Sequence, residues 1–373
     1  MSRALALARR GLGLTRPNPA VGALLVKDGR VIAEGWHRRA GSEHAEVAAI
    51  EAADQPLRGA TLYCTLEPCC HDGPYKRTPP CTRRIISEGI GRVVVAALDP
   101  NPAVDGRGVA ALREAGIEVT VGPLAMPALQ LNEAFAAAVR LRRPFVHLKA
   151  AQTLDGYIAT ADGDSRWITD KQARTVAHEL RAAGDAVVVG AATVRRDNPL
   201  LTVRHVAGRQ PLRVVLSGCR PLPADSPLFH DRFADRTLVY QPEAGRTHVD
   251  LHALLDDLLR RDVQSVLVEG GSRVLSSFLA RGLWDRLSLF VAPRILGGGV
   301  RTVDGLGIAS IADAIALQEV SIERLGNGVL ISGYRDPRQL FGSGFRHREV
   351  VGHAEAGAVP DALMEEGYVY GNC

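Results

Sequence analysis

The chain has 373 residues, of which 46% are hydrophobic and 23% charged, and its formal net charge is +4 at pH 7. This length favours two domains, and the composition excludes a generally disordered chain. The positive excess lies in single and paired arginines without a long basic run, which argues against a nucleic-acid-binding tract, and no uninterrupted apolar run approaches the roughly 18 residues of a membrane span.

The first 14 residues lack a secretory signal pattern, because Arg9 and Arg10 interrupt the apolar run and no small-residue cleavage site follows. Three of the six cysteines crowd into one stretch, which favours metal ligation in a reducing compartment over a disulfide framework. We therefore expect a cytoplasmic protein with neither a membrane span nor a nucleic-acid partner.

In chain order, the first 143 residues alternate between helical and strand patterns. A helical pattern over 2–12 stops before Pro17, and Asp28-Gly29 between two apolar runs predicts a β-hairpin over 21–36. The elements expected next are a helix from His44, a strand over 60–66, a helix over 83–88, a strand over 92–98, a helix and strand within 109–122 and a helix over 126–140. Strands that alternate with helices predict an α/β domain with a mainly parallel sheet.

A cluster of metal-binding residue types lies between these elements. His44-Ala45-Glu46 is followed by Pro68-Cys69 and, after eleven further residues, by Cys81. One imidazole and two thiolates are three protein ligands, which leaves the fourth position of a zinc ion for water, as in catalytic sites. Glu46 is poorly placed to share a helix face with His44, and a carboxylate beside a zinc-bound water can instead move its proton to a leaving amine. The order His-x-Glu, then Pro-Cys and a second cysteine, is the signature of zinc deaminases, although there only two residues separate the cysteines.

Each of these residues also has a plainer interpretation. His44 could pack at a helix start, and the cysteines could be small apolar core residues. Only their joint occurrence with Glu46 and Pro68 favours a zinc site. The turn-rich segment 99–108 either lines a pocket or is a plain connection.

Pro144, which follows a basic helix end, marks the expected domain boundary. Beyond it the sequence predicts a helix over 170–183 and strands over 145–150, 186–189, 212–216, 265–268, 287–291 and 320–334. The strand over 265–268 runs into Gly270-Gly271 and a helix, and N–H groups at a helix start can bind phosphate, although every helix needs an entry turn. Residues 336–373 lose periodicity and predict a poorly ordered tail.

Taken together, these motifs resemble those of the bifunctional riboflavin-biosynthesis deaminase/reductases over roughly residues 1–335. The matching stretches are Pro17–Gly22, His44-Ala45-Glu46, Thr65–Cys69, Arg77–Cys81, Asp99–Pro102, Thr153–Gly156, Trp167-Ile168-Thr169, Gly190–Arg204 and Val268–Gly271. The resemblance implies an α/β fold with a cytidine-deaminase-like three-layer domain over 1–143 and a dihydrofolate-reductase-like domain over 144–335, with 336–373 outside both.

The same resemblance implies the activity. The first domain would hydrolytically deaminate diaminohydroxyphosphoribosylaminopyrimidine with Zn²⁺. The second would use NADPH to reduce the ribose of 5-amino-6-(5-phosphoribosylamino)uracil to the ribitylamino product. Such an enzyme takes a small phosphoribosylated pyrimidine as its partner, and we expect a homo-oligomer.

The resemblance also assigns individual residues. The zinc ligands are His44, Cys69 and Cys81, and Glu46 is the proton shuttle. The NADP contacts are Ala151, Trp167, Thr193, Asp197, Ser217 and Gly271. The substrate contacts are Ser165, Arg181, Leu201, Arg204 and Glu269. Lys149 is either a proton donor or substrate contact, or a surface lysine.

Two features depart from the family pattern: Gly73–Arg77 looks like a three-residue insertion between the cysteine ligands, and the tail after Tyr334 is not required. Three rivals stay open. A nucleic-acid-editing deaminase would share the zinc motif without needing the second domain. A zinc-stabilised binding module would use Cys70 or His71 as a fourth ligand. A third rival is a reductase whose deaminase half is inactive.

Overall fold

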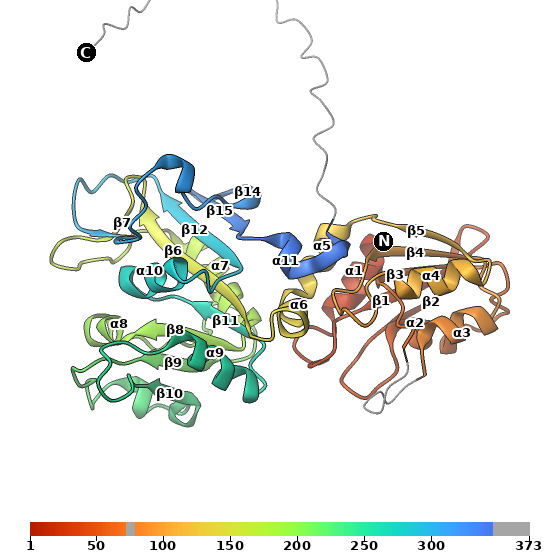
Figure 1. Ribbon diagram of the computed structural model, residues 1–373, viewed down its shortest axis with the longest axis horizontal. Coiled ribbons are helices and arrows are strands. Elements are labelled where there is room, and N and C mark those ends of the chain that lie inside the picture. Colours follow the sequence, from red (N-terminus) through yellow and green to blue (C-terminus); the bar gives the residue numbers. More distant parts are fainter. Residues whose placement is uncertain (72–78, 346–373) are drawn as a thin grey trace, which may run out of the picture.

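A computed structural model of the chain describes residues 1–71 and 79–345, which form two α/β domains side by side (Figure 1). The first domain is built on a five-stranded sheet and the second on an eight-stranded sheet. Within these described ranges, none of the helices combines the length and the apolar character that a bilayer crossing requires.

The five-stranded sheet is mixed. Its strands, in spatial order, are β2 (Arg30–Trp36), β1 (Gly22–Lys27), β3 (Thr61–Leu66), β4 (Arg92–Ala97) and β5 (Glu118–Val121). The predicted hairpin is confirmed, because β1 and β2 pair antiparallel across a turn in which Asp28 and Gly29 both have positive φ. A mainly parallel sheet is wrong for this domain: β1 is antiparallel to both neighbours, and only β3, β4 and β5 run parallel. A two-residue turn joins antiparallel strands, whereas parallel neighbours need a crossover helix.

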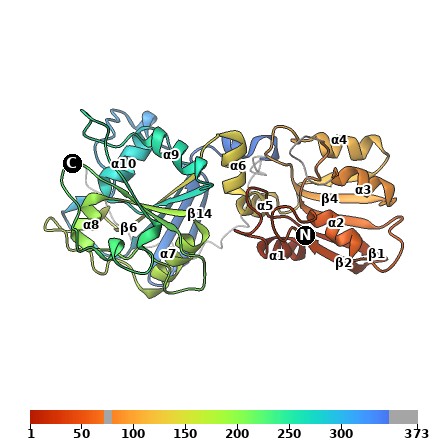
Figure 2. The same cartoon turned by 90° about the horizontal axis from the view of Figure 1, so that it is seen from below.

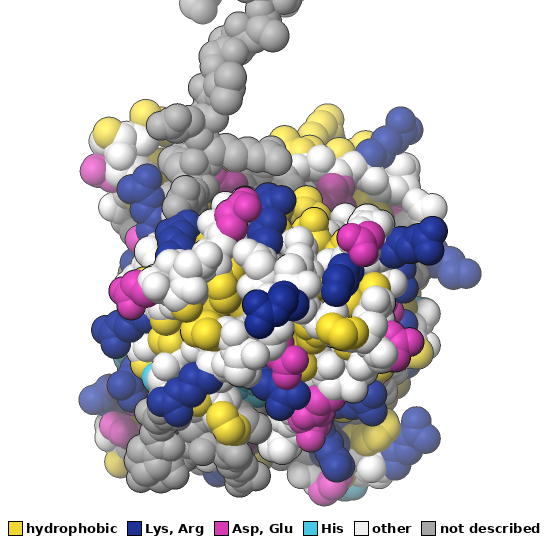
Figure 3. Space-filling view, turned by 90° about the vertical axis from the view of Figure 1, so that its right-hand side faces the viewer, with side chains coloured by type: hydrophobic (Ala, Val, Ile, Leu, Met, Phe, Trp, Pro, Cys, Tyr) yellow, Lys and Arg dark blue, Asp and Glu magenta, His cyan; other side chains and the backbone are white. Residues whose placement is uncertain are grey.

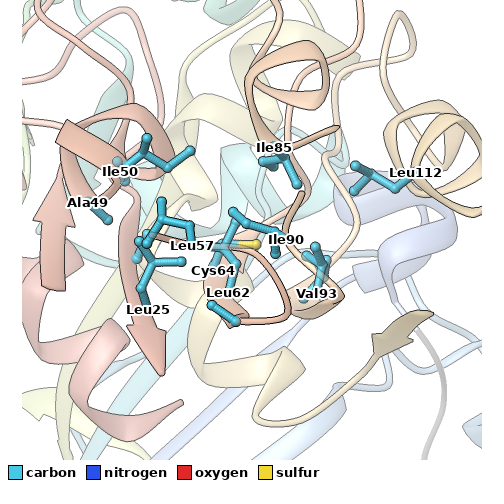
Figure 4. Close-up of a cluster of buried hydrophobic side chains, with 14 of the residues drawn as sticks. Leu25, Ala49, Ile50, Leu57, Leu62, Cys64, Ile85, Ile90, Val93 and Leu112 are labelled. Atoms are coloured by element: carbon cyan, nitrogen blue, oxygen red, sulfur yellow. The ribbon is translucent and has the colours of Figure 1, made fainter. Parts of the chain in front are cut away.

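Helices cover both faces of this sheet, which makes the three layers that were expected. The face nearer the second domain carries α1 (Ser2–Arg9) and α5 (Ala125–Leu131), and the opposite face carries α2 (Ala45–Glu51), α3 (Cys81–Ser87) and α4 (Arg107–Glu114) (Figure 2). Side chains from α2, α3 and α4 pack onto β1, β3 and β4, and Cys64 lies among them as a buried thiol (Figure 4). The plain apolar interpretation therefore holds for Cys64.

The single helix expected over 126–140 is divided into α5 and α6 (Glu133–Arg140). Asn132 separates them, and its side-chain amide accepts the Ala20 N–H at 2.8 Å and donates to the Ala20 carbonyl at 3.1 Å. An asparagine side chain that bonds a distant backbone in this way favours a break in the helix, and here the break turns α6 towards the second domain (Figure 2).

The eight-stranded sheet begins directly after α6. Its order is β10 (Thr237–Tyr240), β9 (Leu212–Leu216), β8 (Ala186–Gly190), β11 (Ser265–Val268), β6 (Phe145–Thr153), β12 (Arg286–Ala292), β15 (Gly328–Tyr334) and β14 (Gln318–Leu325). The first six strands are parallel, and the last two form an antiparallel hairpin at the edge. A small separate ladder pairs β7 (Tyr157–Ala159) with β13 (Val300–Arg301).

Alternate residues of these strands face opposite layers, as the period of two requires. Val188 and Val268 face α9 (Leu251–Arg260) and α10 (Ser272–Ala280), whereas Val187 and Val189 face the side of α8 (Ala191–Asp197). The remaining helix, α7 (Lys171–Ala183), packs on Phe290 on the α8 side of the sheet. Short 3₁₀ turns occupy Pro227–Phe229, Ala234–Arg236, Ile311–Asp313 and Gly342–Gly344.

The segment expected to be a poorly ordered tail begins instead with a packed helix. This helix, α11 (Pro337–Phe341), lies against α6 between the two domains (Figure 1). Its Phe341 is fully buried and contacts Tyr334 edge-on, with ring centroids 5.8 Å apart. The spacing of apolar residues in the sequence does not reveal this helix, because its apolar side chains pack against residues of other elements. The rest of the expected tail, 346–373, falls outside the described residues.

Candidate functional site

The structure brings His44, Cys69 and Cys81 together from three separate segments. His44 is the N-cap of α2, Cys69 follows the end of β3, and Cys81 is the first residue of α3. The start of α3 is fixed by Pro80, whose ring holds its φ at −57° and disfavours helix at the residue before it. Two helix starts and a strand end therefore converge on one point.

The ligand atoms of these three residues have the spacing of a zinc site. His44 Nδ1 lies 3.5 Å from Cys69 Sγ and 3.3 Å from Cys81 Sγ, and the two sulfur atoms are 3.5 Å apart. Zn–S bonds of about 2.3 Å and Zn–N bonds of about 2.0 Å place tetrahedral ligands roughly 3.5 to 3.8 Å apart. The three separations, 3.3 to 3.5 Å, come close to these values, so the donor set fits a zinc ion after small shifts of the side chains.

The environment also favours thiolate at Cys69. Hydrogen bonding with Cys81 is the largest of the effects that lower the pKa of Cys69 to about 3. The backbone N–H of Cys81 lies 3.4 Å from Cys69 Sγ and donates to it. Since thiolate is the form that binds a metal, the site is prepared for one.

Glu46 lies in the first turn of α2, two residues after His44, and is only 4% exposed. Burial, followed by the nearby charge of Cys69, raises the pKa of Glu46 to about 7. Glu46 is not part of the group whose ligand atoms lie within 4.8 Å of one another; among the described residues that group is His44, Cys69 and Cys81. The carboxyl group thus stands beside the three ligands and can serve a bound water.

The alternative fourth ligands, Cys70 and His71, do not join this group in the part of the chain that the structure describes. Three protein ligands are the number found in catalytic zinc sites. The apparent insertion Gly73–Arg77 lies outside the described residues.

Segment 99–108 is fastened beside the metal centre by Glu67, which is 3% exposed. Glu67 accepts the Asp99 N–H at 3.1 Å and the Gly106 N–H at 2.8 Å. Its other oxygen accepts the Val109 N–H at 2.9 Å. Burial is the main cause that raises the pKa of Asp99 to about 7, and the charges of Glu67 and Cys69 add to it. Segment 99–108 is therefore held next to the metal ligands by these hydrogen bonds.

In the second domain, five of the expected cofactor and substrate residues lie at one edge of the eight-stranded sheet. The parallel strands of this sheet end at the same edge: β8 at Gly190, β9 at Leu216 and β11 at Val268, while the longer β6 ends at Thr153. Carboxyl ends of parallel strands share one edge, and α/β folds bind ligands there. Of the predicted residues, those on or directly after these strand ends are Ala151, Thr193, Ser217, Glu269 and Gly271.

Arg181 and Glu269 form a two-point (bidentate) ion pair at this edge. The guanidinium donates to both carboxylate oxygens, at 2.8 and 3.0 Å, and also to the Thr202 carbonyl at 2.7 Å. Lys149 Nζ lies 3.6 Å from the same carboxylate. Burial alone would raise the pKa of Glu269, but Arg181 and Lys149 lower it to about 2. Lys149 therefore belongs to a buried cluster and is not a surface lysine.

Other predicted residues lie on neighbouring elements and differ in burial. A Cβ placed on Gly271 would lie 3.7 Å from Thr193 Oγ1, so α8 and α10 begin close together. The carbonyl of Asp197 accepts from Arg166 at 2.8 Å, which ties α8 to the segment containing Ser165 and Trp167. Trp167 is 61% exposed and stacks on Arg174, whereas Leu201 is buried. Helix α8 is therefore close to the start of α10 and is tied to the segment that contains Ser165 and Trp167.

Two residues that the sequence did not single out hold Arg204 in place. The backbone N–H of Arg204 donates to His178 Nδ1 at 3.2 Å, and its side chain donates to Thr202 Oγ1 at 3.4 Å. Burial lowers the pKa of His178 to about 4, so the ring accepts this bond as a neutral group. One signal for His178 was present, because it lies three residues before Arg181 on the same face of α7.

Replacing Arg181 by Met is expected to lower the free energy of unfolding by about 3 kcal/mol at neutral pH, since Glu269 would keep its charge with Lys149 as its main partner. The loss should shrink as the pH falls from about 5 to 2. The depressed pKa of Glu269 stabilises the fold only above the unfolded value near 4.5, and this contribution disappears as the carboxylate is protonated.

Urea unfolding of Arg181→Met and of Arg181→Met/Glu269→Gln measures this effect. The double variant, which removes both charges, is expected to recover most of the loss. Equal stability of the wild type and the single variant would show that the ion pair contributes nothing.

Comparison with known proteins covers both domains. The family model of the cytidine and deoxycytidylate deaminase zinc-binding region matches residues 1–97, and that of the RibD C-terminal domain matches residues 144–331.

Full-length relatives match along most of the chain. Riboflavin biosynthesis protein RibD of Aquifex aeolicus is 43% identical over 346 residues, which cover 89% of this chain and 96% of that protein. The Escherichia coli protein of the same name is 38% identical over 360 residues, with 89% and 97% covered.

Solved structures of similar length show the same two-domain arrangement. A diaminohydroxyphosphoribosylaminopyrimidine deaminase/5-amino-6-(5-phosphoribosylamino)uracil reductase from Thermotoga maritima has 42% identity and a TM-score of 0.75, and the match covers 90% of this chain and 97% of that one. Acinetobacter baumannii RibD has 36% identity and a TM-score of 0.74 with the same coverage.

Proposed function

The chain belongs to the RibD family of bifunctional riboflavin-biosynthesis deaminase/reductases, and from this membership we propose a substrate for each domain and a role for each site residue. The first domain is a zinc-binding deaminase domain and the second a reductase domain of the NADPH-dependent type. The substrates are the two compounds in the name of the Thermotoga maritima relative: the diaminopyrimidine for deamination and the phosphoribosylaminouracil for reduction.

The observation that carries the deaminase assignment is a trio of zinc-compatible ligands with a buried carboxyl group beside it. His44, Cys69 and Cys81 hold the ion, which when bound supplies the Lewis acidity that makes water a nucleophile near neutral pH. Glu46 takes the proton released by the attacking water and gives it to the leaving amino group. Burial raises the pKa of its carboxyl to about 7, which suits a group that must both accept and donate a proton.

In the reductase, the sheet edge binds NADPH and the ribose phosphate of the substrate. The proposed cofactor contacts are Ala151, Trp167, Thr193, Asp197, Ser217 and Gly271, and the proposed substrate contacts are Ser165, Arg181, Leu201, Arg204 and Glu269. Lys149, within reach of Glu269, is a further candidate for contact with the reacting sugar.

The charge distribution favours a small substrate over nucleic acid. On the face at the outer end of the deaminase domain, positive and negative side chains are interspersed and do not gather into one basic surface (Figure 3). Nucleic-acid binding depends on clustered Lys and Arg that neutralise phosphates.

Two assays test the proposed function on the purified chain. Ammonia release from the phosphoribosylated diaminopyrimidine reports the deaminase, and NADPH oxidation with its deaminated product reports the reductase. We expect both, with a lower kcat/KM for NADH than for NADPH. Reduction without ammonia release would identify an inactive deaminase half, and the absence of both activities would overturn the proposal.

We further propose that the protein is a cytoplasmic homo-oligomer. Closely spaced cysteines that bind a metal instead of forming disulfides are typical of a reducing compartment. The edge strand β14 is largely exposed, and Ile322 is 69% exposed beside Ile331, its cross-strand partner on β15. An exposed edge strand presents unpaired N–H and C=O groups, with which a strand of a second copy can pair.

Replacing Ile322 by Glu should therefore convert the oligomer to monomers. Mass measurement in solution at micromolar concentration checks this. Val31→Glu is the matched control, since Val31 is 41% exposed on β2, the edge strand of the other sheet. An unchanged mass for Ile322→Glu would exclude β14 as the contact.

A further inference from the structure

The loop between α1 and β1 carries an arginine that reaches from the deaminase domain into the reductase domain. Arg16 forms an ion pair with Asp185, which lies just before β8, and donates to Ser265 Oγ at 3.4 Å. The Arg16 side chain is 22% exposed and that of Asp185 is 6% exposed. Burial and the neighbouring Arg209 lower the pKa of Arg16 to about 10, so the guanidinium stays charged at neutral pH.

Asp185 is a rigid anchor for this arginine. One of its oxygens accepts the backbone N–H groups of Gln264 and Ser265 and the Ser265 hydroxyl, each at 3.0 Å. The other oxygen meets Arg16 and Arg209. Because three hydrogen bonds fix the carboxylate, the position of Arg16 is set by the reductase domain.

The same loop is connected to the metal centre two residues further on. Asn18 Nδ2 donates to His37 Nε2 at 3.1 Å, and His37 Nδ1 then donates to the Glu43 carbonyl at 2.9 Å. An acceptor at Nε2 requires the proton to be on Nδ1, so both bonds agree on one tautomer. The His37 ring stands edge-on to that of His44, with centroids 5.4 Å apart. A continuous set of contacts therefore runs from Asp185 to the segment that carries His44.

We propose that Arg16 and Asp185 are positioning residues of the deaminase, through which the reductase domain holds the loop of Asn18 against His37 and the metal-ligand segment. This inference rests on the deaminase role proposed for the zinc site. Full deaminase activity then requires the reductase domain in place, although that domain contributes no group to the deamination itself.

The test compares Arg16→Gln with Arg209→Gln. Both variants remove one guanidinium from the same carboxylate oxygen, but Arg209 belongs to the reductase domain and its ion pair does not involve the Asn18 loop. Arg16→Gln should lower kcat/KM for ammonia release by about 10 to 10²-fold, the range expected from a small misplacement near a reacting centre. Zinc content and NADPH oxidation should stay within about twofold of the wild type, and Arg209→Gln should leave all three unchanged.

A second readout does not depend on activity. In Arg16→Gln, amide hydrogen exchange should become faster over residues 15–20, where the N–H groups of Asn18 and Ala20 are hydrogen-bonded in the wild type. Arg16→Lys keeps the charge with fewer donors and should show a smaller change in the same direction. Since it is the milder replacement, it carries the test if Arg16→Gln does not fold, as judged by NADPH oxidation.

The outcomes separate the inference from the proposed function. A wild type that releases no ammonia contradicts the deaminase proposal, whereas the exchange measurement still decides whether Arg16 orders the loop. Wild-type ammonia release together with unchanged activity and exchange in Arg16→Gln overturns the inference. Equal losses in Arg16→Gln and Arg209→Gln also overturn it, because they would indicate a general effect on Asp185.

Discussion

Glu46→Gln is expected to reduce ammonia release by a factor of about 10² to 10⁴, the usual contribution of a positioned proton-transfer group. Glutamine fills the same buried space beside Cys69 and Cys81, but its amide cannot take a proton from water and pass it on. Because Glu46 is not among the three ligands, zinc content and NADPH oxidation should both be retained.

Glu51→Gln is the matched control, since it makes the same substitution at an exposed position of the same helix. It should leave ammonia release unchanged. Retention of more than about a tenth of wild-type ammonia release by Glu46→Gln would contradict its role as the proton shuttle.

Cys81→Ser should remove both the zinc and the deaminase activity while NADPH oxidation continues. A hydroxyl is a far poorer zinc ligand than a thiolate, and among the described residues the ligand group has no member besides His44, Cys69 and Cys81. Cys69→Ser should behave in the same way.

Metal analysis of the purified variants checks this directly, and Cys70→Ser is the comparison because Cys70 adjoins Cys69 without belonging to the ligand group. It should keep its zinc. Full zinc occupancy and ammonia release in Cys81→Ser would show that the inserted residues between the cysteines have supplied a different ligand.

Local chemistry made several features predictable from sequence. Asp28-Gly29 specified the hairpin because both residues readily take positive φ, and the expected helix over 83–88 forms as α3, which begins at Cys81 directly after Pro80. The ligand trio followed from residue types that zinc selects. Each of these depends on a few neighbouring residues.

Other features depend on partners that sequence spacing does not reveal. The break at Asn132 arises from its bonds to Ala20, and α11 is stable because Phe341 finds Tyr334 and α6. The sequence patterns of these segments do not reveal these contacts. The sequence therefore predicts one helix over 126–140, where the structure has α5 and α6, and a poorly ordered tail where α11 packs.

By itself, the sequence determined the candidate zinc ligand set and the division into two α/β halves, because both follow from residue type and local periodicity. Only the tertiary structure shows which residues of the two halves contact each other. Arg16 and Asp185 resemble ordinary charged residues in the sequence, and no pattern links positions so far apart. Their pairing is decided where the two domains meet, since a buried charge is stable only beside an opposite charge and hydrogen-bond donors that the fold has brought to the same place.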